Sequence, residues 1–351
     1  MHGEYKVPGG KLVVVDLDVA ADRLKDVRVS GDFFAEPDEL LDALTSALDD
    51  QPADAGVGAL TQALDEAVAR MPGAALIGAT TRDVAVAVRR ALGRSTSWAD
   101  TEFTLLDTGP QSPSMHAALD QVLTEELAAG RRGPTLRFWE WETPAVIIGS
   151  FQSLSNEVDL QAAQRYGVQV VRRISGGGAM FMEAGNCITF SLVVPESLVD
   201  GLSYEESYQF LNQWVLGALA DVRVEARLSG LNDISSPAGK IAGSAQKRMV
   251  GGAVLHHVTM AYDIDAEKMG RVLRIGREKL SDKGTPSAVR RVDPVRSQTQ
   301  MAREDVIAAF RRYFRARYRT VEGGLTGGEL ARAARLRAEK FDNPEWTARV
   351  P

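Results

Sequence analysis

Cysteine is almost absent from this 351-residue chain, histidine is scarce, and long apolar runs are missing. The single cysteine, Cys187, excludes an intramolecular disulfide and a zinc site built on several cysteines, and it fits a reducing compartment. No apolar run reaches membrane-spanning length, and the N-terminal MHGEYKVPGG lacks the pattern of a secretory signal. We therefore expect a soluble, cytoplasmic protein.

An excess of positive charge is also lacking. The formal net charge is -6, which argues against general nucleic-acid binding, because that function usually shows as a basic footprint. The first hundred residues are rich in acids, whereas arginine and lysine are frequent from Gln164 onward. An anionic ligand is therefore expected in the second part of the chain.

The length favours two domains. We place a small first domain at residues 1–95, a linker at 96–104 and a larger domain at 105–351. The first domain is expected to be an α+β unit of order β-β-α-α-α. Its elements are strands at Lys11–Val19 and Lys25–Val29 and helices at Leu40–Leu48, Val57–Arg70 and Arg82–Leu92.

The larger domain alternates strand and helix patterns. We predict helices at Ser114–Ala129, Asn156–Tyr166, Tyr204–Ala220, Glu304–Arg317 and Gly328–Lys340. The predicted strands are Leu136–Trp141, Ala145–Gly149, Gln169–Ile174, Cys187–Val194, Val224–Leu228, Lys240–Lys247, Gly252–His256 and Met260–Ile264.

A glycine run after the Gln169–Ile174 strand is the most informative segment. It reads VRRISGGGAMF from Val171 to Phe181. Glycines let main-chain N–H groups approach a ligand closely, and arginines beside them suit a phosphate or a carboxylate. The alternative is a hairpin turn flanked by two solvated arginines. The run is not a Walker A loop, and Phe181 stands where G-x-G-x-x-G needs its third glycine.

A lysine followed by small residues forms a second candidate site. The segment LNDISSPAGKIAGSAQK begins at Leu231, and Lys240 precedes small residues that leave room for a ligand. The alternative is a hairpin whose lysine points to water. His256 and His257 are adjacent on a strand and must face opposite sides, so they cannot readily share a metal; one of them could line a pocket while the other packs in the core. Cys187 lies in an apolar run and is expected to be buried rather than nucleophilic.

Together these segments resemble the lipoate-protein ligase A family of the biotin/lipoate protein ligase superfamily. The matching segments are RRISGGGAMFMEAGN (Arg172–Asn186), LNDI (Leu231–Ile234), GKIAGSAQKR (Gly239–Arg248), GGAVLHH (Gly251–His257), KLSDKGTPSAVRRV (Lys279–Val292) and EKFDNPEW (Glu339–Trp346). The resemblance implies an α+β fold, in which a catalytic domain with mixed sheets and surrounding helices accompanies a small α+β accessory domain. Here the accessory domain would come first, at residues 1–95, although it follows the catalytic domain in the best-known members.

The resemblance also implies roles for individual residues. Lys240 matches the catalytic lysine that reaches the carboxyl oxygen and the α-phosphate, and Arg173 matches an arginine that contacts the acyl-adenylate. Asp233 would lie near Mg²⁺, which is held mainly by the ATP phosphates. The full set of implied substrate- and nucleotide-binding residues is Arg173, Ser175, Gly176, Gly177, Gly178, Ala179, Met180, Phe181, Asn186, Asn232, Asp233, Lys240, Ser244 and His257.

The implied activity is ATP-dependent ligation, in which lipoate becomes lipoyl-AMP and the lipoyl group then passes to a lysine of a lipoyl domain. Acceptors would be 2-oxoacid dehydrogenase acyltransferase subunits or the glycine-cleavage H protein, and a monomer is expected. Two departures concern the acyl group. Val258 replaces a glycine common in the family, a change that could narrow or reshape the acyl pocket, and GSFQS (Gly149–Ser153) replaces a more polar motif.

Three rival functions remain open at this stage. An octanoyl- or lipoyl-transferase of the same fold would need a nucleophilic cysteine before the lysine motif, and residues 223–239 contain none. A biotin ligase usually carries a more basic glycine loop. A non-catalytic lipoyl-domain binding protein would be favoured by loss of Lys240 or Arg173, yet both residues are present.

Overall fold

The computed structural model describes residues 1–7, 10–93, 96, 98, 100–274 and 292–351. Within them the chain forms two compact units, one of Met1–Asp100 with Glu196–Phe210 and the other of Thr101–Pro195 with Leu211–Pro351. The segment Lys279–Val292, one of the family-like motifs, lies outside the described residues except for its last residue. None of the described helices is long and apolar enough to cross a membrane.

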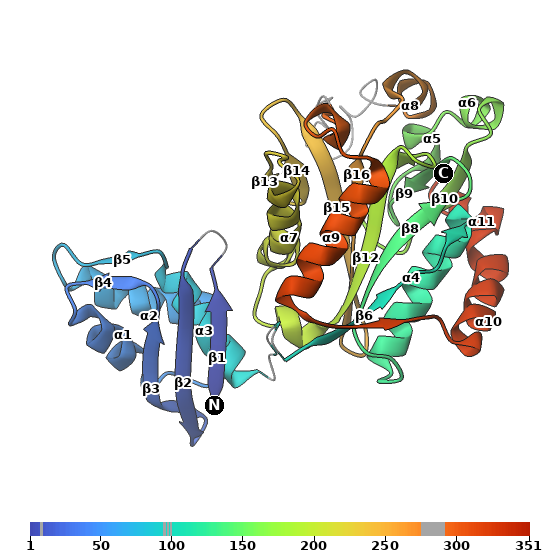
Figure 1. Cartoon of the computed structure of the whole chain (residues 1–351). Coiled ribbons are helices and arrows are strands. Elements are labelled where there is room, and N and C mark those ends of the chain that lie inside the picture. The colour runs from blue at the N-terminus through green and yellow to red at the C-terminus, as the bar shows by residue number, and fades with distance from the viewer. Residues whose placement is uncertain (8–9, 94–95, 97, 99, 275–291) are drawn as a thin grey trace. The chain divides into compact units, whose positions relative to one another are not determined.

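The first unit combines a three-stranded antiparallel sheet with helices (Figure 1). Its elements are β1 (His2–Lys6), β2 (Leu12–Ala20), β3 (Arg23–Gly31), β4 (Phe34–Glu36), α1 (Leu40–Leu48), α2 (Val57–Ala69), β5 (Ala75–Ile77) and α3 (Thr81–Leu92). The predicted helices are confirmed, because their buried leucines and valines repeat at helical spacing. The order β-β-α-α-α was incomplete, since β1, β4 and β5 are short strands with too few alternating residues to signal themselves.

The second unit is built on a nine-stranded mixed sheet. Its strands are β6 (Glu102–Leu106), β7 (Pro110–Gln111), β8 (Thr135–Trp141), β12 (Cys187–Pro195), β13 (Arg227–Ser229), β14 (Asp233–Ser235), β15 (Lys240–Met249), β16 (Ala253–Ala261) and β17 (Arg319–Gly323). They are ordered β13-β14-β15-β16-β12-β8-β6-β17, and β7 pairs with β8. Since β6 begins at Glu102, residues 102–104 of the expected linker are part of this sheet.

A smaller sheet of order β10-β9-β11 carries the glycine loop. It consists of β9 (Ala145–Ile148), β10 (Gln169–Arg172) and β11 (Met180–Met182). The helices and short helical turns around the two sheets are α4 (Pro113–Ala128), α5 (Leu154–Glu157), α6 (Leu160–Arg165), α7 (Tyr204–Asp221), α8 (Ala266–Val272), η2 (Val295–Ser297), α9 (Arg303–Arg317), α10 (Gly327–Leu336), η3 (Arg337–Phe341) and α11 (Pro344–Ala348). The short helical turn η1 (Glu196–Val199) and the part of α7 up to Phe210 belong to the first unit. Mixed sheets with surrounding helices confirm the predicted α+β class.

Four predicted elements need correction. The strands expected at Gly252–His256 and Met260–Ile264 are one continuous strand, β16, because polar His257 and Thr259 continue its alternation toward a pocket. The helix expected at Asn156–Tyr166 is two short helices, since Asp159 caps the second with its side chain. The strand expected at Val224–Leu228 is confined to β13.

The alternation of side chains gives the central sheet two different faces. Helices α7 and α9 cover one face, where Trp214 of α7 packs against Phe190 of β12 and Phe310 of α9 (Figure 1). Helix α4 covers the other face, where Asp120 hydrogen-bonds Ser191 of β12. The face toward α4 carries the polar side chains from which the candidate site is built.

Candidate active site

A pocket lies where the central sheet meets the smaller sheet and the glycine loop. Its lining residues come from β8, β9, β11, β12, β15 and β16, together with the loops before β11 and β14. They are Trp139, Ile147, Arg173, Gly178, Ala179, Met180, Met182, Thr189, Asn232, Lys240, Gly243, Ser244, Ala245, His257 and Thr259. Charged and amide groups gather near Lys240, and aromatic, aliphatic and thioether groups gather around Trp139. Such a pocket suits an elongated ligand with one polar end and one apolar end.

The strand register explains the floor of the pocket. Gly243 of β15 pairs with Thr259 of β16, which pairs with Thr189 of β12, which in turn pairs with Trp139 of β8. These four neighbours share one face of the sheet and run from the lysine end to the apolar end. Gly243 leaves space, because an added Cβ would lie 3.1 Å from the Lys240 Nζ. The small residues after the lysine therefore do create room, as their pattern suggested.

Lys240 is held at the polar end by an ion pair. Its Nζ lies 2.8 Å from Asp233 Oδ1, and about a third of its side chain is exposed. The turn before it is fixed by Ser236, whose hydroxyl accepts from the N–H groups of Ala238 and Gly239. The Ser236 hydroxyl also contacts buried Asp293. The ammonium group therefore enters the pocket from a rigid turn and points along a defined direction.

The glycine loop is wrapped around Arg173. The Arg173 guanidinium donates to the carbonyls of Gly176 and Gly178, at 2.5 and 2.9 Å, and to the Ser175 hydroxyl at 3.0 Å. Gly177 has a φ of +90°, and an added Cβ would lie 2.9 Å from the Arg173 Nη2. Only glycine adopts that conformation without strain at this close approach.

The neighbouring arginine has a different role. Arg172 is fully buried and donates to the carbonyls of Gly149 and Gln152 and to those of Thr347 and Val350. It therefore joins the Gly149–Ser153 loop to the C-terminal residues. Both Arg172 and Arg173 are buried, so the alternative of a hairpin flanked by two solvated arginines is wrong.

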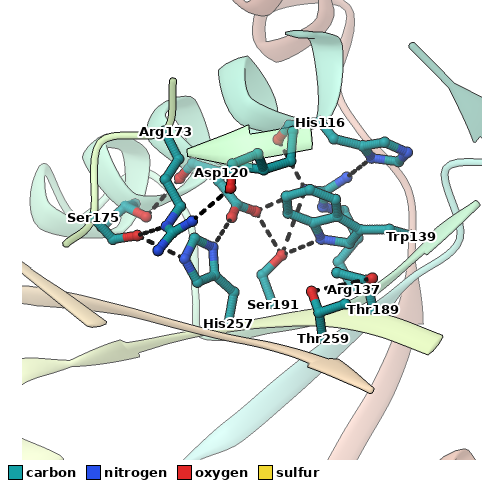
Figure 2. Close-up of polar contacts among 12 residues, drawn as sticks. His116, Asp120, Arg137, Trp139, Arg173, Ser175, Thr189, Ser191, His257 and Thr259 are labelled. Carbon is teal, nitrogen blue, oxygen red and sulfur yellow. Dashed lines mark hydrogen bonds and ion pairs between the residues drawn. The ribbon is translucent and has the colours of Figure 1, made fainter. Parts of the chain in front are cut away.

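A hydrogen-bonded cluster lies beneath the pocket and is centred on Asp120 of α4 (Figure 2). Its Oδ1 accepts from Arg137 at 2.7 Å and from Ser191 at 2.5 Å, and its Oδ2 lies 2.9 Å from His257 Nδ1. Burial raises the pKa of Asp120, but the His257 hydrogen bond and the Arg137 guanidinium outweigh burial and lower it overall. Asp120 is therefore a buried carboxylate that stays ionised.

The cluster also orients aromatic side chains. Trp139 donates to Ser191 at 2.6 Å, and His116 stacks on Trp139 with ring centroids 4.6 Å apart. Arg137 donates to His116 Nδ1 at 2.9 Å, so the other ring nitrogen carries the proton and donates to the Glu140 carbonyl. Burial and the nearby Arg137 lower the pKa of His116 to about 3, and the ring remains neutral. Trp139 is thereby fixed as a wall of the pocket.

The structure brings eight of the expected binding residues to the pocket lining. These are Arg173, Gly178, Ala179, Met180, Asn232, Lys240, Ser244 and His257. Ser175, Gly176, Gly177 and Asp233 contact lining residues without being part of the lining. Their binding roles remain predictions.

Two expected residues lie away from the lining. Phe181 packs in a separate apolar cluster with Val146 and Ile148, because β11 turns Met180 and Met182 toward the pocket. Asn186 hydrogen-bonds Glu183 in the turn before β12. Both residues lie outside the pocket lining, and their roles in binding stay predictions.

Sequence reasoning overlooked Asp120, Arg137 and Trp139. A usable signal existed, because His116 and Asp120 are four residues apart on an otherwise apolar stretch of α4 and must share one face. What the sequence could not reveal is that Arg137 and Ser191, on two paired strands, meet that face.

The adjacent histidines do face opposite sides of the sheet. His257 lines the pocket, whereas His256 is fully buried and hydrogen-bonds Asn212 of α7 at 2.9 Å. Val258 is fully buried and does not belong to the lining. Val258 therefore does not face the pocket, because its neighbours His257 and Thr259 hold the positions that do, and an effect of Val258 on the acyl pocket stays a prediction.

Cys187 is buried beneath the pocket floor, where its sulfur lies 4.0 Å from the hydroxyl of the lining residue Thr189. It is 1 % exposed, its thiol contacts the Glu183 carbonyl, and it does not line the pocket. Burial raises the pKa of the thiol to about 11. The described residues contain no group of three or more histidine, cysteine and acidic side chains that would form a metal cage.

Residues 112–315 match the family described as the lipoyl protein ligase A/B catalytic domain. The chain belongs to this family. It is 30% identical to the octanoyltransferase LipM of Moorella thermoacetica, with 70% of this chain and 97% of the relative covered. It is 29% identical to the lipoate-protein ligase A subunit 1 of Thermoplasma acidophilum, with 69% and 94% covered. The resemblance inferred from the motifs is thereby confirmed, and the protein is an enzyme of the lipoate ligase and acyltransferase family.

Solved structures give the same result. A bipartite lipoate protein ligase from Thermoplasma acidophilum is 30% identical with a TM-score of 0.62, covering 72% of this chain and 98% of that one. A lipoate-protein ligase A bound with ATP is 26% identical with a TM-score of 0.61, covering 72% and 100%. A putative lipoate protein ligase from Thermoplasma acidophilum with bound lipoic acid is 27% identical with a TM-score of 0.59, covering 71% and 99%. These likenesses confirm the predicted α+β fold with mixed sheets and surrounding helices.

Proposed function

We propose that this chain is an ATP-dependent lipoate–protein ligase. Its relatives include both ligases and octanoyltransferases, so the choice rests on the chemistry of this pocket. The observation that carries the proposal is the state of Cys187, the single cysteine of the chain. A transferase that passes the acyl group through a thiol needs a thiolate in contact with the substrate.

Cys187 meets neither requirement of that route. Its thiol does not line the pocket, and burial raises its pKa to about 11. At neutral pH only about one thiol in ten thousand would be ionised. An acyl group entering this pocket must therefore be activated in another way, and activation as an adenylate requires no protein nucleophile.

The polar end of the pocket suits adenylate chemistry. In the first half-reaction a carboxylate oxygen of lipoate attacks the α-phosphorus of ATP, a C–O–P linkage forms, and pyrophosphate leaves. Two anions must approach each other for this step. The Lys240 ammonium, directed by its turn and by Asp233, lies where it can neutralise both and stabilise the charge that develops.

In the second half-reaction the amine of an acceptor lysine attacks the acyl carbonyl, AMP leaves, and the amine loses a proton. The same ammonium can polarise the carbonyl oxygen and stabilise the departing phosphate. The apolar wall of Trp139, Ile147, Met180 and Met182 would hold the acyl tail away from water.

Magnesium fits this site only as a companion of the nucleotide. Asp233 is the carboxylate at the polar end, and Asn232 adds an amide beside it. Mg²⁺ commonly binds through one or two carboxylates together with substrate phosphates. The single carboxylate of Asp233 and the amide of Asn232 match this mode of binding. When bound, the ion would neutralise phosphate charge.

The acceptor would be a lipoyl domain of a 2-oxoacid dehydrogenase acyltransferase subunit or the glycine-cleavage H protein. One of the related ligases was solved in a study with its E2 lipoyl domain. We further propose that residues 1–95 are the accessory domain and residues 105–351 the catalytic domain. The same relative is described as bipartite, which supports a division of the ligase into separable parts.

Lipoate-dependent exchange between ATP and pyrophosphate tests the proposal. The wild type should catalyse exchange, and Lys240→Ala should lower its rate by about a hundredfold or more, because a charge that stabilises the transition state is lost. Lys247→Ala is the matched control, since it removes the same charge from the same strand outside the pocket lining. A wild-type enzyme that catalyses no lipoate-dependent exchange would refute the proposed ligase activity.

The second candidate is an octanoyltransferase, which the names of several relatives favour. It predicts ATP-independent transfer of an octanoyl group from a thioester donor to a lipoyl domain. It also predicts that Cys187→Ser abolishes this transfer. The ligase proposal predicts that Cys187→Ser retains full pyrophosphate exchange, so one variant separates the two functions.

A further inference from the structure

A chain of three hydrogen bonds joins the buried carboxylate of α4 to the glycine loop (Figure 2). Asp120 Oδ2 lies 2.9 Å from His257 Nδ1, and His257 Nε2 lies 2.7 Å from Ser175 Oγ. Arg173 Nε donates to the same Ser175 oxygen at 3.0 Å. The chain therefore spans from a helix beneath the sheet to the arginine that the glycine loop surrounds.

The direction of every proton in this chain follows from its two ends. Asp120 is an ionised carboxylate and can only accept, so the Nδ1 of His257 carries a hydrogen and donates it. With that single hydrogen on the ring, the Nε2 is an acceptor, and it receives the hydroxyl hydrogen of Ser175. The Ser175 oxygen is left free to accept from Arg173.

The arrangement resembles a Ser–His–Asp triad, but its serine is not placed to attack a substrate. Ser175 is fully buried and does not line the pocket. Its oxygen also accepts the Arg173 hydrogen bond, which reduces its nucleophilicity. The three side chains therefore orient other groups rather than form a covalent intermediate.

The group they orient is the Arg173 guanidinium. Its other nitrogens donate to the carbonyls of Ile147, Gly176 and Gly178, so its position sets the path of the loop that lines the pocket. The hydrogen bond that Arg173 donates to Ser175 fixes the rotation of the guanidinium about its long axis. A rotation of that plane would move the two glycine carbonyls with it.

We propose that Asp120 and Ser175 are positioning residues, which act through His257 and Arg173 to hold the glycine loop in the geometry needed for adenylate formation. This inference rests on the proposed ligase function. Asp120 also holds Ser191, which accepts from the pocket wall Trp139, so one carboxylate fixes two walls of the same pocket. The glycine loop and the Trp139 wall are thereby held at fixed positions relative to each other.

Ser175→Ala provides the kinetic test, because the serine does not itself line the pocket. We expect the kcat of lipoate-dependent pyrophosphate exchange to fall about tenfold, while the KM for lipoate changes less than twofold. Ser114→Ala is the matched control, since Ser114 is a fully buried serine of α4 outside the pocket lining. A Ser175→Ala enzyme with the wild-type kcat, or with a change in KM alone, would overturn the inference.

Two variants of His257 separate positioning from simple core stability. Glutamine places its amide near the Nε2 position and can accept from Ser175 while losing Asp120. Asparagine places its amide near the Nδ1 position and can donate to Asp120 while losing Ser175. We expect His257→Gln to keep at least fivefold more kcat than His257→Asn. The reverse order would mean that the ring only satisfies the buried carboxylate.

The tautomer of His257 supplies a readout that does not depend on activity. Nitrogen-15 NMR of the full-length protein at pH 7.5 should show the hydrogen on Nδ1. In Asp120→Asn the amide would donate to the ring, and the hydrogen should move to Nε2. A wild-type ring protonated on Nε2 would overturn the inference. If wild type shows no pyrophosphate exchange, the proposed function fails, and this measurement still decides whether the hydrogen-bond chain exists.

Discussion

The two faces of the central sheet use the same strands for different purposes. On β16, His256 and His257 are neighbours, yet one is sealed against α7 and the other lines the pocket. The α7 face is filled by Phe190, Trp214 and Val258, and its few polar groups bond one another. The opposite face carries Thr189, Thr259, Ser191 and charged groups beside an open pocket.

This contrast shows how one strand separates stability from chemistry. Because successive residues alternate sides, a single position decides whether a substitution meets the core or the substrate. Changes on the α7 face should therefore act on the free energy of unfolding, and changes on the pocket face should act on catalysis.

Acidification gives the largest expected effect and involves one histidine on each face. Burial lowers the pKa of both His256 and His116 to about 3. The unfolded chain binds these protons near pH 6.5, so the stability they confer is full above that pH and is lost as the pH falls. At pH 5 each should cost about 2 kcal/mol relative to pH 8. Urea unfolding at the two pH values measures this loss, and a flat profile would contradict it.

Replacing His256 should destabilise the protein strongly while sparing catalysis. His256→Leu would leave Asn212 and Gln246 without their ring partners, at a cost of about 2–3 kcal/mol. The variant should also lose half of the acid sensitivity described above. Urea unfolding at pH 8 and pyrophosphate exchange at saturating substrate check both parts. A kcat reduced more than twofold in the folded enzyme would break the contrast between the faces.

Gly243→Ala should show the opposite pattern. The new Cβ would meet the mobile end of Lys240 at 3.1 Å, so the ammonium must move while the backbone stays. We expect exchange activity to fall about tenfold, equivalent to about 1.4 kcal/mol in the barrier, with little change in the melting temperature. Gly270→Ala, at a helical glycine with open space around it, is the matched control and should retain activity.

Two adjacent substitutions provide the finest comparison. Val258→Thr puts a hydroxyl into the apolar α7 face and should cost about 1–2 kcal/mol of stability without affecting the choice of acyl substrate. Thr259→Val removes a hydroxyl from the pocket floor, where it contacts Met182 sulfur and Thr189. It should change the lipoate-to-octanoate ratio of kcat/KM by about twofold to fivefold. Equal effects of both variants on that ratio would contradict the two-face description.

Much of this separation was readable from the sequence. The two histidines had to face opposite sides because they are adjacent on a strand, and the small residues after Lys240 indicated space near a ligand. The helices α1 to α4 followed from their apolar spacing. These features depend on local periodicity, which a single sequence records directly.

The remaining features depend on which strands pair. Nothing local indicated that Arg137 and Ser191 would become partners beneath α4, or that Asp120 would bond His257 across 137 positions of sequence. The continuity of β16 was also missed, because pocket-facing polar residues broke the apolar pattern used to recognise strands. Polar residues that face a pocket from a buried strand therefore make that strand hard to recognise from its sequence.

The central position of β12 has a consequence for hydrogen exchange. This strand is bonded on one side to β16 and on the other to β8, and nearly all of its residues are buried. Its amide hydrogens should exchange only when the whole unit opens, so a ligand that stabilises the folded unit should slow all of them by the same factor. The glycine loop lies outside both sheets, and its amides should show the protection that ligands impose. Deuterium uptake would thus separate local protection at a few loop residues from the global stabilisation that the amides of β12 report.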